Sequence, residues 1–137
     1  MIVIDASVLT DFLLKRPEAL SAVESELASR EHEPLHAPEL IETETLNALR
    51  RLARSGAVTV QRAGEAAADL ANTRLMRYPH APLRERVWAL RDSLTAYDAC
   101  YLALAEALDE PVLLTADSGL ATVARSTLGD DAVRHVN

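Results

Sequence analysis

The stretch that decides the fold is the amino-terminal run of residues 1–7, MIVIDAS. Four apolar residues lead directly into Asp5, which is followed by a small residue and by the hydroxyl of Ser7. A short, unbroken apolar run is typical of a strand that is buried on both faces, as in a parallel sheet. An acid directly after such a strand lies at its carboxyl end, where open α/β sheets bind ligands. This stretch therefore predicts a carboxylate at the ligand-binding edge of a parallel sheet.

Further apolar segments alternate with helical patterns along the chain. Additional short strands are expected at 33–38, 75–78, 111–115 and 132–136. Helices are expected at 7–15, 17–29, 38–55, 59–74, 83–91, 95–108 and 118–128, with Pro38 opening the long one and Gly56 closing it. Strands separated by helical crossovers indicate a mainly parallel sheet with helices on both faces, the α/β class.

Size and composition suit one cytoplasmic domain over residues 1–137. Hydrophobic residues make up 49% of the 137 and charged residues 26%, an ordinary globular balance. No apolar run is long enough to span a membrane, Asp5 interrupts the only run that resembles a signal peptide, and Cys100 is the single cysteine. The net charge of −7 opposes a basic nucleic-acid surface but suits an acidic site that recruits divalent cations.

Two further aspartates occupy positions like that of Asp5. Asp117 also follows an apolar strand and precedes a helix, so parallel strands would deliver both acids to one edge. Asp98 follows Thr95 by three residues, the capping-box spacing, at the start of a helix that is apolar nearly all round. Each aspartate alone could be a helix cap, but their convergence favours a functional site.

The long central helix offers Glu39, Glu42 and Glu44. A helical wheel places four apolar residues on its core face: Ile41, Ala48, Leu49 and Leu52. Glu42 and Glu44 fall near opposite borders of that face, so helix geometry does not choose between them. Glu39, expected in the first turn, is most simply a partner for the helix dipole.

Several carboxylates that converge without bases repel one another unless a cation joins them. Clustered hard oxygen ligands suit Mg²⁺ or Mn²⁺. Such a metal stabilises phosphate charge and lowers the pKa of a bound water for attack on phosphorus. The expected chemistry is metal-dependent hydrolysis of a phosphodiester.

The same segments resemble the PIN domain and, within it, the VapC-type toxins of toxin–antitoxin pairs. The matching segments are 3–7 (VIDAS), 44–51 (ETLNALRR), 94–99 (LTAYDA) with 103–106, and 114–117 (LTAD) with 120–121. The resemblance implies a three-layer α/β/α sandwich and an acidic site for Mg²⁺ or Mn²⁺. It implies an endoribonuclease toxin of a type II pair that cuts structured RNA such as tRNA or rRNA, a homodimer, and a cognate antitoxin that blocks the site.

Carried over by position, the metal-site acids are Asp5, Glu44, Asp98 and Asp117. The family glutamate stands just ahead of the Asn-Ala-Leu-Arg run, which favours Glu44 and leaves Glu42 as the weaker candidate. Asp5 and Asp98 are assigned as the principal metal ligands, while Glu44 and Asp117 complete the site directly or through water.

Ser7 and Thr115 match positions whose hydroxyls support the acids through hydrogen bonds or bound water. The remaining chemistry-bearing residues have plainer interpretations. Arg50, Arg51 and Arg54 suit the dipole at the end of the long helix better than phosphate contact, and Cys100, Trp88 and Tyr101 suit the core or a dimer contact. The histidines lack a ligand spacing and are expected on the surface: His32, His36, His80 and His135.

Four other functions compete with this interpretation. One is a PIN-like RNA-processing nuclease outside a toxin–antitoxin pair, and another is a PIN-like module that binds a protein without catalysis. An aspartyl phosphatase would want a second acid where Ser7 stands, and a phospho-receiver domain would want a late lysine, whereas Lys15 is the only lysine.

Overall fold

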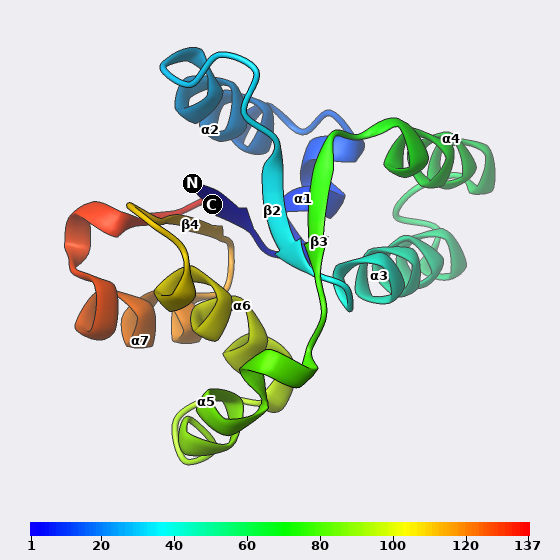
Figure 1. Ribbon diagram of the computed structural model, residues 1–137. Helices are drawn as coiled ribbons and strands as arrows, with labels where there is room; N and C mark the ends of the chain where they lie inside the picture. The colour runs from blue at the N-terminus through cyan, green and yellow to red at the C-terminus, as the bar shows by residue number, and fades with distance from the viewer.

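The computed structural model describes residues 1–137, and its centre is a five-stranded sheet in which all neighbouring strands are parallel (Figure 1). The strand order is β3-β2-β1-β4-β5. The strands are β1 (Ile2–Ile4), β2 (Leu35–Pro38), β3 (Leu75–Tyr78), β4 (Val112–Thr115) and β5 (Val133–His135). The predicted parallel sheet is confirmed, with strand ends that differ by one or two residues.

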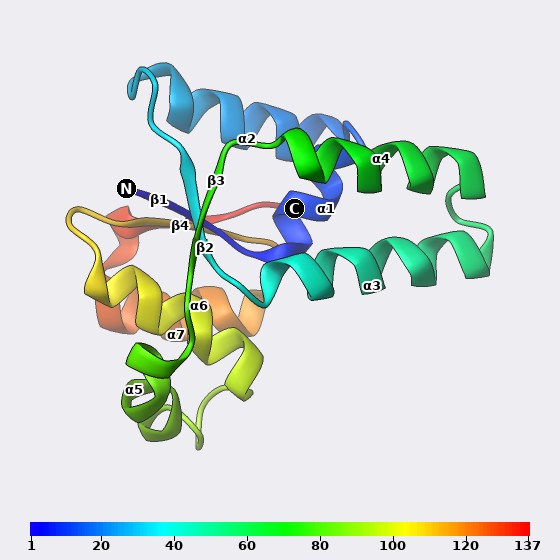
Figure 2. The same ribbon diagram turned by 45° about the vertical axis from the view of Figure 1, so that its right-hand side comes forward.

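Seven α-helices cover the two faces of this sheet. They are α1 (Ala6–Leu13), α2 (Pro17–Ala28), α3 (Ile41–Ser55), α4 (Val60–Asn72), α5 (Arg84–Ala89), α6 (Ala96–Ala107) and α7 (Ser118–Leu128), with short 3₁₀ turns at Ala81–Leu83 and Asp130–Ala132. Helices α1 to α4 lie on one side of the sheet and α5 to α7 on the other (Figures 1 and 2). The three-layer α/β/α sandwich is therefore confirmed.

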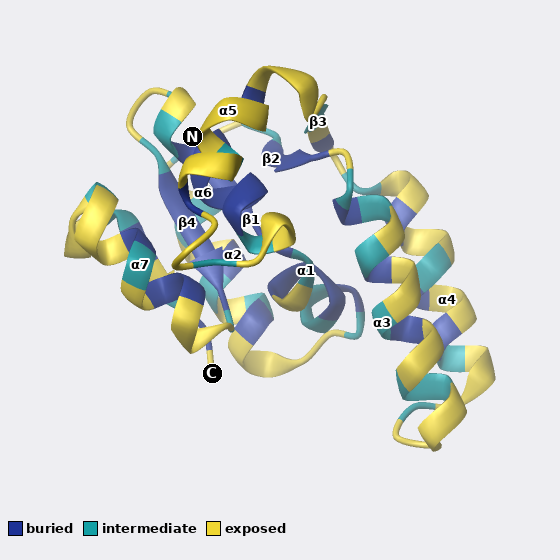
Figure 3. Ribbon diagram, turned by 90° about the horizontal axis from the view of Figure 1, so that it is seen from below, coloured by how far each residue is buried: buried dark blue, intermediate teal, exposed yellow.

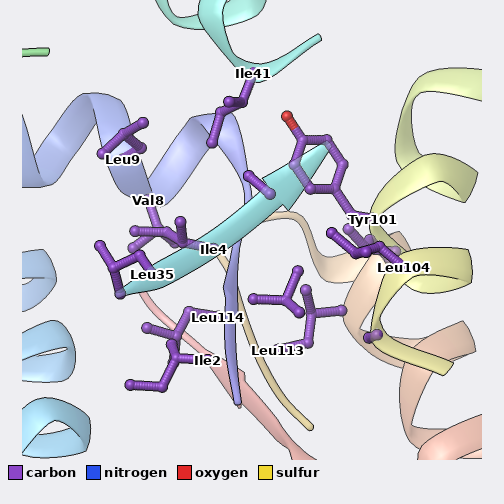
Figure 4. Packing of buried hydrophobic residues seen from close by; sticks show 14 of the residues in the cluster. Ile2, Ile4, Val8, Leu9, Leu35, Ile41, Tyr101, Leu104, Leu113 and Leu114 are labelled. Carbon is purple, nitrogen blue, oxygen red and sulfur yellow. The ribbon is translucent and has the colours of Figure 1, made fainter. Parts of the chain in front are cut away.

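The core lies on both faces of the central strands. All residues of β1, β2 and β4 are buried, which explains the unbroken apolar runs Ile2–Ile4 and Val112–Leu114. One cluster of 32 buried apolar residues joins the sheet to the helices above and below it (Figure 4). Buried segments gather in the sheet and on the helix faces against it, whereas much of α3 and α4 is exposed (Figure 3).

After β1, the chain adds β2 and β3 on one side of the sheet and then places β4 and β5 on the other side of β1, so the switch point lies between β1 and β4. β1 pairs with β2 on one side, with Val3 opposite His36, and with β4 on the other, with Val3 opposite Leu113. In open α/β sheets, the carboxyl ends of the strands at such a switch point form the crevice that holds ligands. Asp5 and Asp117 directly follow the two strands that flank this point.

The predicted start of the long helix is wrong. Pro38 is the last residue of β2, and α3 begins only at Ile41, after a turn that contains Glu39. Proline is tolerated there because β2 pairs only with β3 at this level, so no second strand needs its missing N–H. The backbone N–H of Leu40 donates to Nε2 of His80 at 3.0 Å, and Glu39 does not belong to the first turn of the helix.

The burial of several side chains differs from the sequence-based expectation. His36 is buried, not on the surface, and its Nδ1 shares a 2.7 Å hydrogen bond with the Tyr78 hydroxyl. Trp88 is 68% exposed on α5, which contributes no buried residue, so it is not a core side chain, and its predicted alternative role as a dimer contact stays a prediction. On α3, Thr45 is buried in the core face in place of the predicted Ala48 and Leu52, which are only partly buried.

No helix of the structure combines the length and the apolar character that crossing a membrane requires.

Candidate active site

An open pocket of about 450 Å³ lies at the carboxyl edge of the sheet, beside the switch point. Five acids line it; Asp11 on α1 is paired with Arg16, and the other four come from four separate segments of the chain. Asp5 follows β1, Glu44 lies in the first turn of α3, Asp98 lies in the first turn of α6, and Asp117 follows β4. The pocket is lined by Asp5, Ala6, Ser7, Thr10, Asp11, Arg16, Glu44, Ala48, Arg51, Leu52, Asp98, Tyr101 and Asp117.

Asp5 forms the buried floor of this pocket and is held by donors on both carboxylate oxygens. Its Oδ1 accepts hydrogen bonds from the backbone N–H of Val8 at 3.0 Å and from the Ser7 hydroxyl at 2.5 Å. Its Oδ2 accepts a short hydrogen bond from the Thr115 hydroxyl. Asp5 is therefore both the N-cap of α1 and a carboxylate with one fixed orientation. Burial raises its pKa, and the three donors partly offset that rise.

The hydroxyls of Ser7 and Thr115 also tie the ends of β1 and β4 together. Ser7 Oγ accepts from the backbone N–H of Ala116 at 3.1 Å, and Thr115 Oγ1 accepts from that of Asp117 at 2.9 Å. Each hydroxyl thus donates to Asp5 while it accepts from the turn that leads into α7. The two predicted supporting hydroxyls both contact the Asp5 carboxylate and link the two strand ends.

Asp117 lies at the exposed rim and caps α7. Its Oδ1 accepts from the backbone N–H of Leu120 at 2.8 Å. Gly119 leaves room for this conformation, because a Cβ atom added there would stand 3.2 Å from Asp117 Oδ1. The capping bond occupies one carboxylate oxygen and leaves the other for a ligand.

Asp98 is half-buried in the first turn of α6, where the Thr95 hydroxyl accepts a hydrogen bond from its backbone N–H at 3.2 Å. The capping-box spacing is therefore real, and it positions Asp98 at the pocket. Burial, reinforced by the charges of Asp117, Asp5 and Glu44, raises the pKa of Asp98 from 3.8 to about 6. This rise shows that the acids are close enough to oppose one another's ionisation.

The two glutamates that helix geometry could not separate lie in different surroundings. Glu44 lines the pocket, and its Oε1 accepts a 2.6 Å hydrogen bond from the Tyr101 hydroxyl. Glu42 instead forms an ion pair with Arg77 on β3, outside the pocket. Burial raises the pKa of Glu44, the Tyr101 bond lowers it, and the charge of Asp5 raises it again.

Tyr101 is a site residue that the sequence did not identify. Its ring packs in the core, with its hydroxyl directed away from Leu104 towards the α3 end of the cluster (Figure 4). Burial and the Glu44 carboxylate raise its pKa, so the hydroxyl remains a hydrogen-bond donor at any ordinary pH. The only available signal was that Tyr101 lies one helical turn after Asp98 on α6, which places both on one side of that helix.

The donors of this pocket fit a hydrated divalent cation. All four acids offer hard carboxylate oxygens, and no lysine or histidine lines the pocket. The structure contains no group of three or more acidic, His or Cys side chains arranged to hold an ion directly, and hydroxyl or backbone donors already engage Asp5, Glu44 and Asp117. Mg²⁺ is commonly bound through one or two carboxylates while it keeps several waters, which matches this arrangement.

Two arginines share the pocket with the acids. Arg16 precedes α2 and donates to Asp11 Oδ1 at 2.8 Å, so its charge is already paired. Arg51 reaches the pocket from α3 and has no ion-pair partner, whereas Arg50 and Arg54 do not line it. Of the three arginines predicted to serve the helix dipole, only Arg54 lies in the last turn of α3, and their role there stays a prediction.

Comparison with known proteins places this geometry in a family context. The chain matches the family model described as PIN domain over residues 2–126. It is 41% identical over 129 residues to Ribonuclease VapC9 of Mycobacterium tuberculosis, which covers 92% of this chain and 93% of that protein. It is 38% identical over 120 residues to Ribonuclease VapC3 of the same species, which covers 88% of this chain and 85% of that protein. A shorter match of 87 residues, 47% identical, relates 63% of this chain to 65% of Ribonuclease VapC1, also from M. tuberculosis.

Proposed function

The chain belongs to the PIN-domain family and lies among its VapC ribonucleases, and from this premise we propose that the acidic pocket is the active site of a metal-dependent endoribonuclease. The observation that carries the proposal is the convergence of Asp5, Glu44, Asp98 and Asp117 on one pocket from four distant segments. Helix capping explains the position of each aspartate separately but does not explain why all of them face the same pocket.

Asp5 and Asp98 would be the principal ligands of one Mg²⁺ or Mn²⁺ ion. Three hydrogen-bond donors hold Asp5 in one orientation. The pKa of Asp98 is raised, and a bound cation would lower it by stabilising the charged carboxylate. Glu44 and Asp117 would complete the site directly or through water, since one oxygen of each already accepts a hydrogen bond. The bound cation supplies phosphate charge stabilisation and a water of lowered pKa.

The residues of the chain orient the reacting groups around that position. Tyr101 orients the Glu44 carboxylate, and the hydroxyls of Ser7 and Thr115 orient the Asp5 carboxylate and partly offset the rise in its pKa that burial causes. Attack by water on phosphorus, with the bridging 3′-oxygen as leaving group, gives a 5′-phosphate on the downstream fragment and a 3′-hydroxyl on the upstream one.

The biological setting of the proposal is a type II toxin–antitoxin pair. In it the chain is the toxin, its substrate is structured RNA such as tRNA or rRNA in the cytoplasm, and a cognate antitoxin blocks the pocket. We further propose a homodimer, which is supported by exposed apolar side chains such as Trp88, beside an apolar hollow of about 250 Å³. Light scattering of the purified chain tests the dimer.

The central experiment compares Asp5→Asn with Glu42→Gln in purified protein supplied with Mn²⁺. Total bacterial RNA is treated with each protein, and new 5′-phosphate ends are mapped. Asp5→Asn should lower the cleavage rate at least about 100-fold, since it alters a proposed metal ligand while an amide can still cap α1. Glu42→Gln lies outside the pocket and should cleave like the wild type.

Three results would contradict the proposal. They are full cleavage by Asp5→Asn, undiminished cleavage by the wild type in excess chelator, and the absence of any cleavage by wild type with Mn²⁺. Circular dichroism of Asp5→Asn confirms that a loss of activity does not reflect unfolding.

A further inference from the structure

The acidic pocket contains a single unpaired positive charge, the guanidinium of Arg51. The other arginine in the pocket, Arg16, donates to Asp11 at 2.8 Å and is thereby neutralised. Arg51 is exposed, lines the pocket, and forms neither an ion pair nor a side-chain hydrogen bond, although four acids without a basic partner share that pocket with it. An exposed guanidinium that does not pair with available carboxylates is free to bind an anion from solution.

The helical repeat directs Arg51 along the same face as Glu44. The two residues are seven apart on α3, which corresponds to two turns and about 10 Å along the helix axis. Side chains on a helix lean towards its N-terminus, so Arg51 leans back towards the acids. The residue between them on this face is Ala48, whose small side chain leaves the path open.

The position of Arg51 is not accounted for by the dipole of α3. The dipole acts on charges within the last turn, and the basic residue of that turn is Arg54. Arg51 lies further from the C-terminal end at Ser55 and faces the pocket. Arg54 and Arg50 share the helix and the charge but not the pocket, and this makes them matched controls.

We propose that Arg51 is a positioning residue that binds a backbone phosphate of the RNA next to the phosphate being cut. This inference rests on the proposed endoribonuclease function and adds the group that holds the substrate. The chain carries a net charge of −7, and its four site acids repel RNA, so binding needs a local cation besides the metal. A guanidinium suits this because its planar donors match two phosphate oxygens at once.

The test measures cleavage kinetics of Arg51→Ala against Arg54→Ala and Arg50→Ala, on the RNA that the wild type cleaves most in total bacterial RNA. Arg51→Ala should raise KM about tenfold or more, the effect expected from losing a hydrogen bond to a charged group. Its dependence of log(kcat/KM) on log[salt] should be shallower by about 0.7, the value for one lost phosphate contact on single-stranded RNA. Arg51→Lys should recover part of the affinity and the whole salt slope, since it keeps the charge but not the two-point contact.

Titration with Mn²⁺ separates phosphate binding from a general effect on the acids. We expect Arg51→Ala to bind Mn²⁺ at least as tightly as the wild type, because it removes a positive charge from the pocket. An unchanged KM and salt slope in Arg51→Ala, or equal losses in Arg54→Ala and Arg50→Ala, would overturn the assignment of Arg51 while leaving the nuclease intact. If the wild type cleaves no RNA with Mn²⁺, the nuclease proposal itself falls, and the inference about Arg51 falls with it.

Discussion

At the scale of single residues, the site is built from side chains that do two things at once. Asp5 caps α1 and forms the floor of the pocket, and Ser7 and Thr115 donate to Asp5 while they accept from the turn before α7. Tyr101 fills the core with its ring and directs Glu44 with its hydroxyl. Replacing one of these residues therefore changes stability and site geometry together, and the two effects must be measured separately.

Tyr101→Phe tests the link between the core and Glu44. The variant keeps the buried ring but removes the 2.6 Å hydrogen bond, which also allows the pKa of Glu44 to rise further. We expect a stability loss of about 1–2 kcal/mol in urea unfolding. We also expect about a tenfold fall in the rate of RNA cleavage, since Glu44, a proposed metal ligand, loses its orienting partner.

Tyr78→Phe is the matched control for this prediction. It removes a tyrosine hydroxyl bonded to His36, on residues that do not line the pocket. We expect Tyr78→Phe to lower the free energy of unfolding by a similar amount and to cleave RNA at the wild-type rate. Equal activity in the two variants would show that Tyr101 serves only the core.

At the scale of elements, the site depends on where helices begin. The N-termini of α1, α6 and α7 all lie at the carboxyl edge of the sheet, and Asp5, Thr95 and Asp117 cap them. Asp98 reaches the pocket because Thr95 begins α6 three residues before it. The capping and catalytic interpretations of these aspartates are therefore compatible, since capping positions the acids at the pocket.

Gly119→Ala tests how closely α7 and Asp117 fit. The added methyl group would stand 3.2 Å from Asp117 Oδ1, so the carboxylate must shift by a few tenths of an ångström. The gain in helix propensity, about 0.5–1 kcal/mol, should be largely cancelled by this crowding. We expect thermal stability close to that of the wild type and a several-fold lower cleavage rate.

Gly64→Ala in α4 is the reference for that substitution. A Cβ atom there meets no atom within 4 Å, so the propensity gain should appear in full. Its cleavage should equal that of the wild type. A Gly119→Ala variant that is stabilised as much as Gly64→Ala and is fully active would show that Asp117 tolerates the displacement.

At the scale of the whole molecule, the clustered acids of the site lower the free energy of unfolding of the metal-free protein. The acids are gathered beside the buried ends of β1 and β4, and burial together with neighbouring acidic charges raises the pKa values of Asp5, Glu44 and Asp98. In the absence of a cation, the burial of the 32 apolar core residues outweighs this repulsion between the acids. Removing a site acid that caps no helix, such as Asp98, should therefore stabilise the metal-free fold while it abolishes activity.

Asp98→Asn should show this effect with a defined pH dependence. The pKa of Asp98 is about 6 in the folded protein against an ordinary value of 3.8, so the unfolded chain releases its proton first as the pH rises. The stability that Asp98 contributes is present below about pH 4 and is lost as the pH rises to about 6. In excess chelator, Asp98→Asn should be more stable than the wild type at pH 7.5, with the difference shrinking towards pH 4.5.

Urea unfolding followed by circular dichroism at these two pH values measures the difference. Saturating Mn²⁺ should reverse the order at pH 7.5, because a ligand that binds only the folded wild type stabilises it. An Asp98→Asn variant that is less stable than the wild type at pH 7.5 in chelator would contradict the raised pKa.

The amino-acid sequence by itself determined the local structure and the identities of the acids. Unbroken apolar runs at β1 and β4, flanked by helical patterns, specify buried parallel strands, because only a strand covered on both faces tolerates such runs. The position of an acid directly after a strand, or three residues after a capping threonine, is likewise a short-range signal. Asp5, Asp98 and Asp117 could be singled out for this reason before the fold was known.

Only the tertiary structure decided which side chains meet. Glu44 is distinguished from Glu42 by Tyr101, which is 57 residues away, and by Arg77 on β3, which pairs with Glu42. The position of Arg51 in a pocket lined by acids from other segments also emerges only when α3 packs against the rest of the fold. A helix wheel fixes the direction of a side chain relative to its own axis, whereas the packing of the helices determines what that side chain faces.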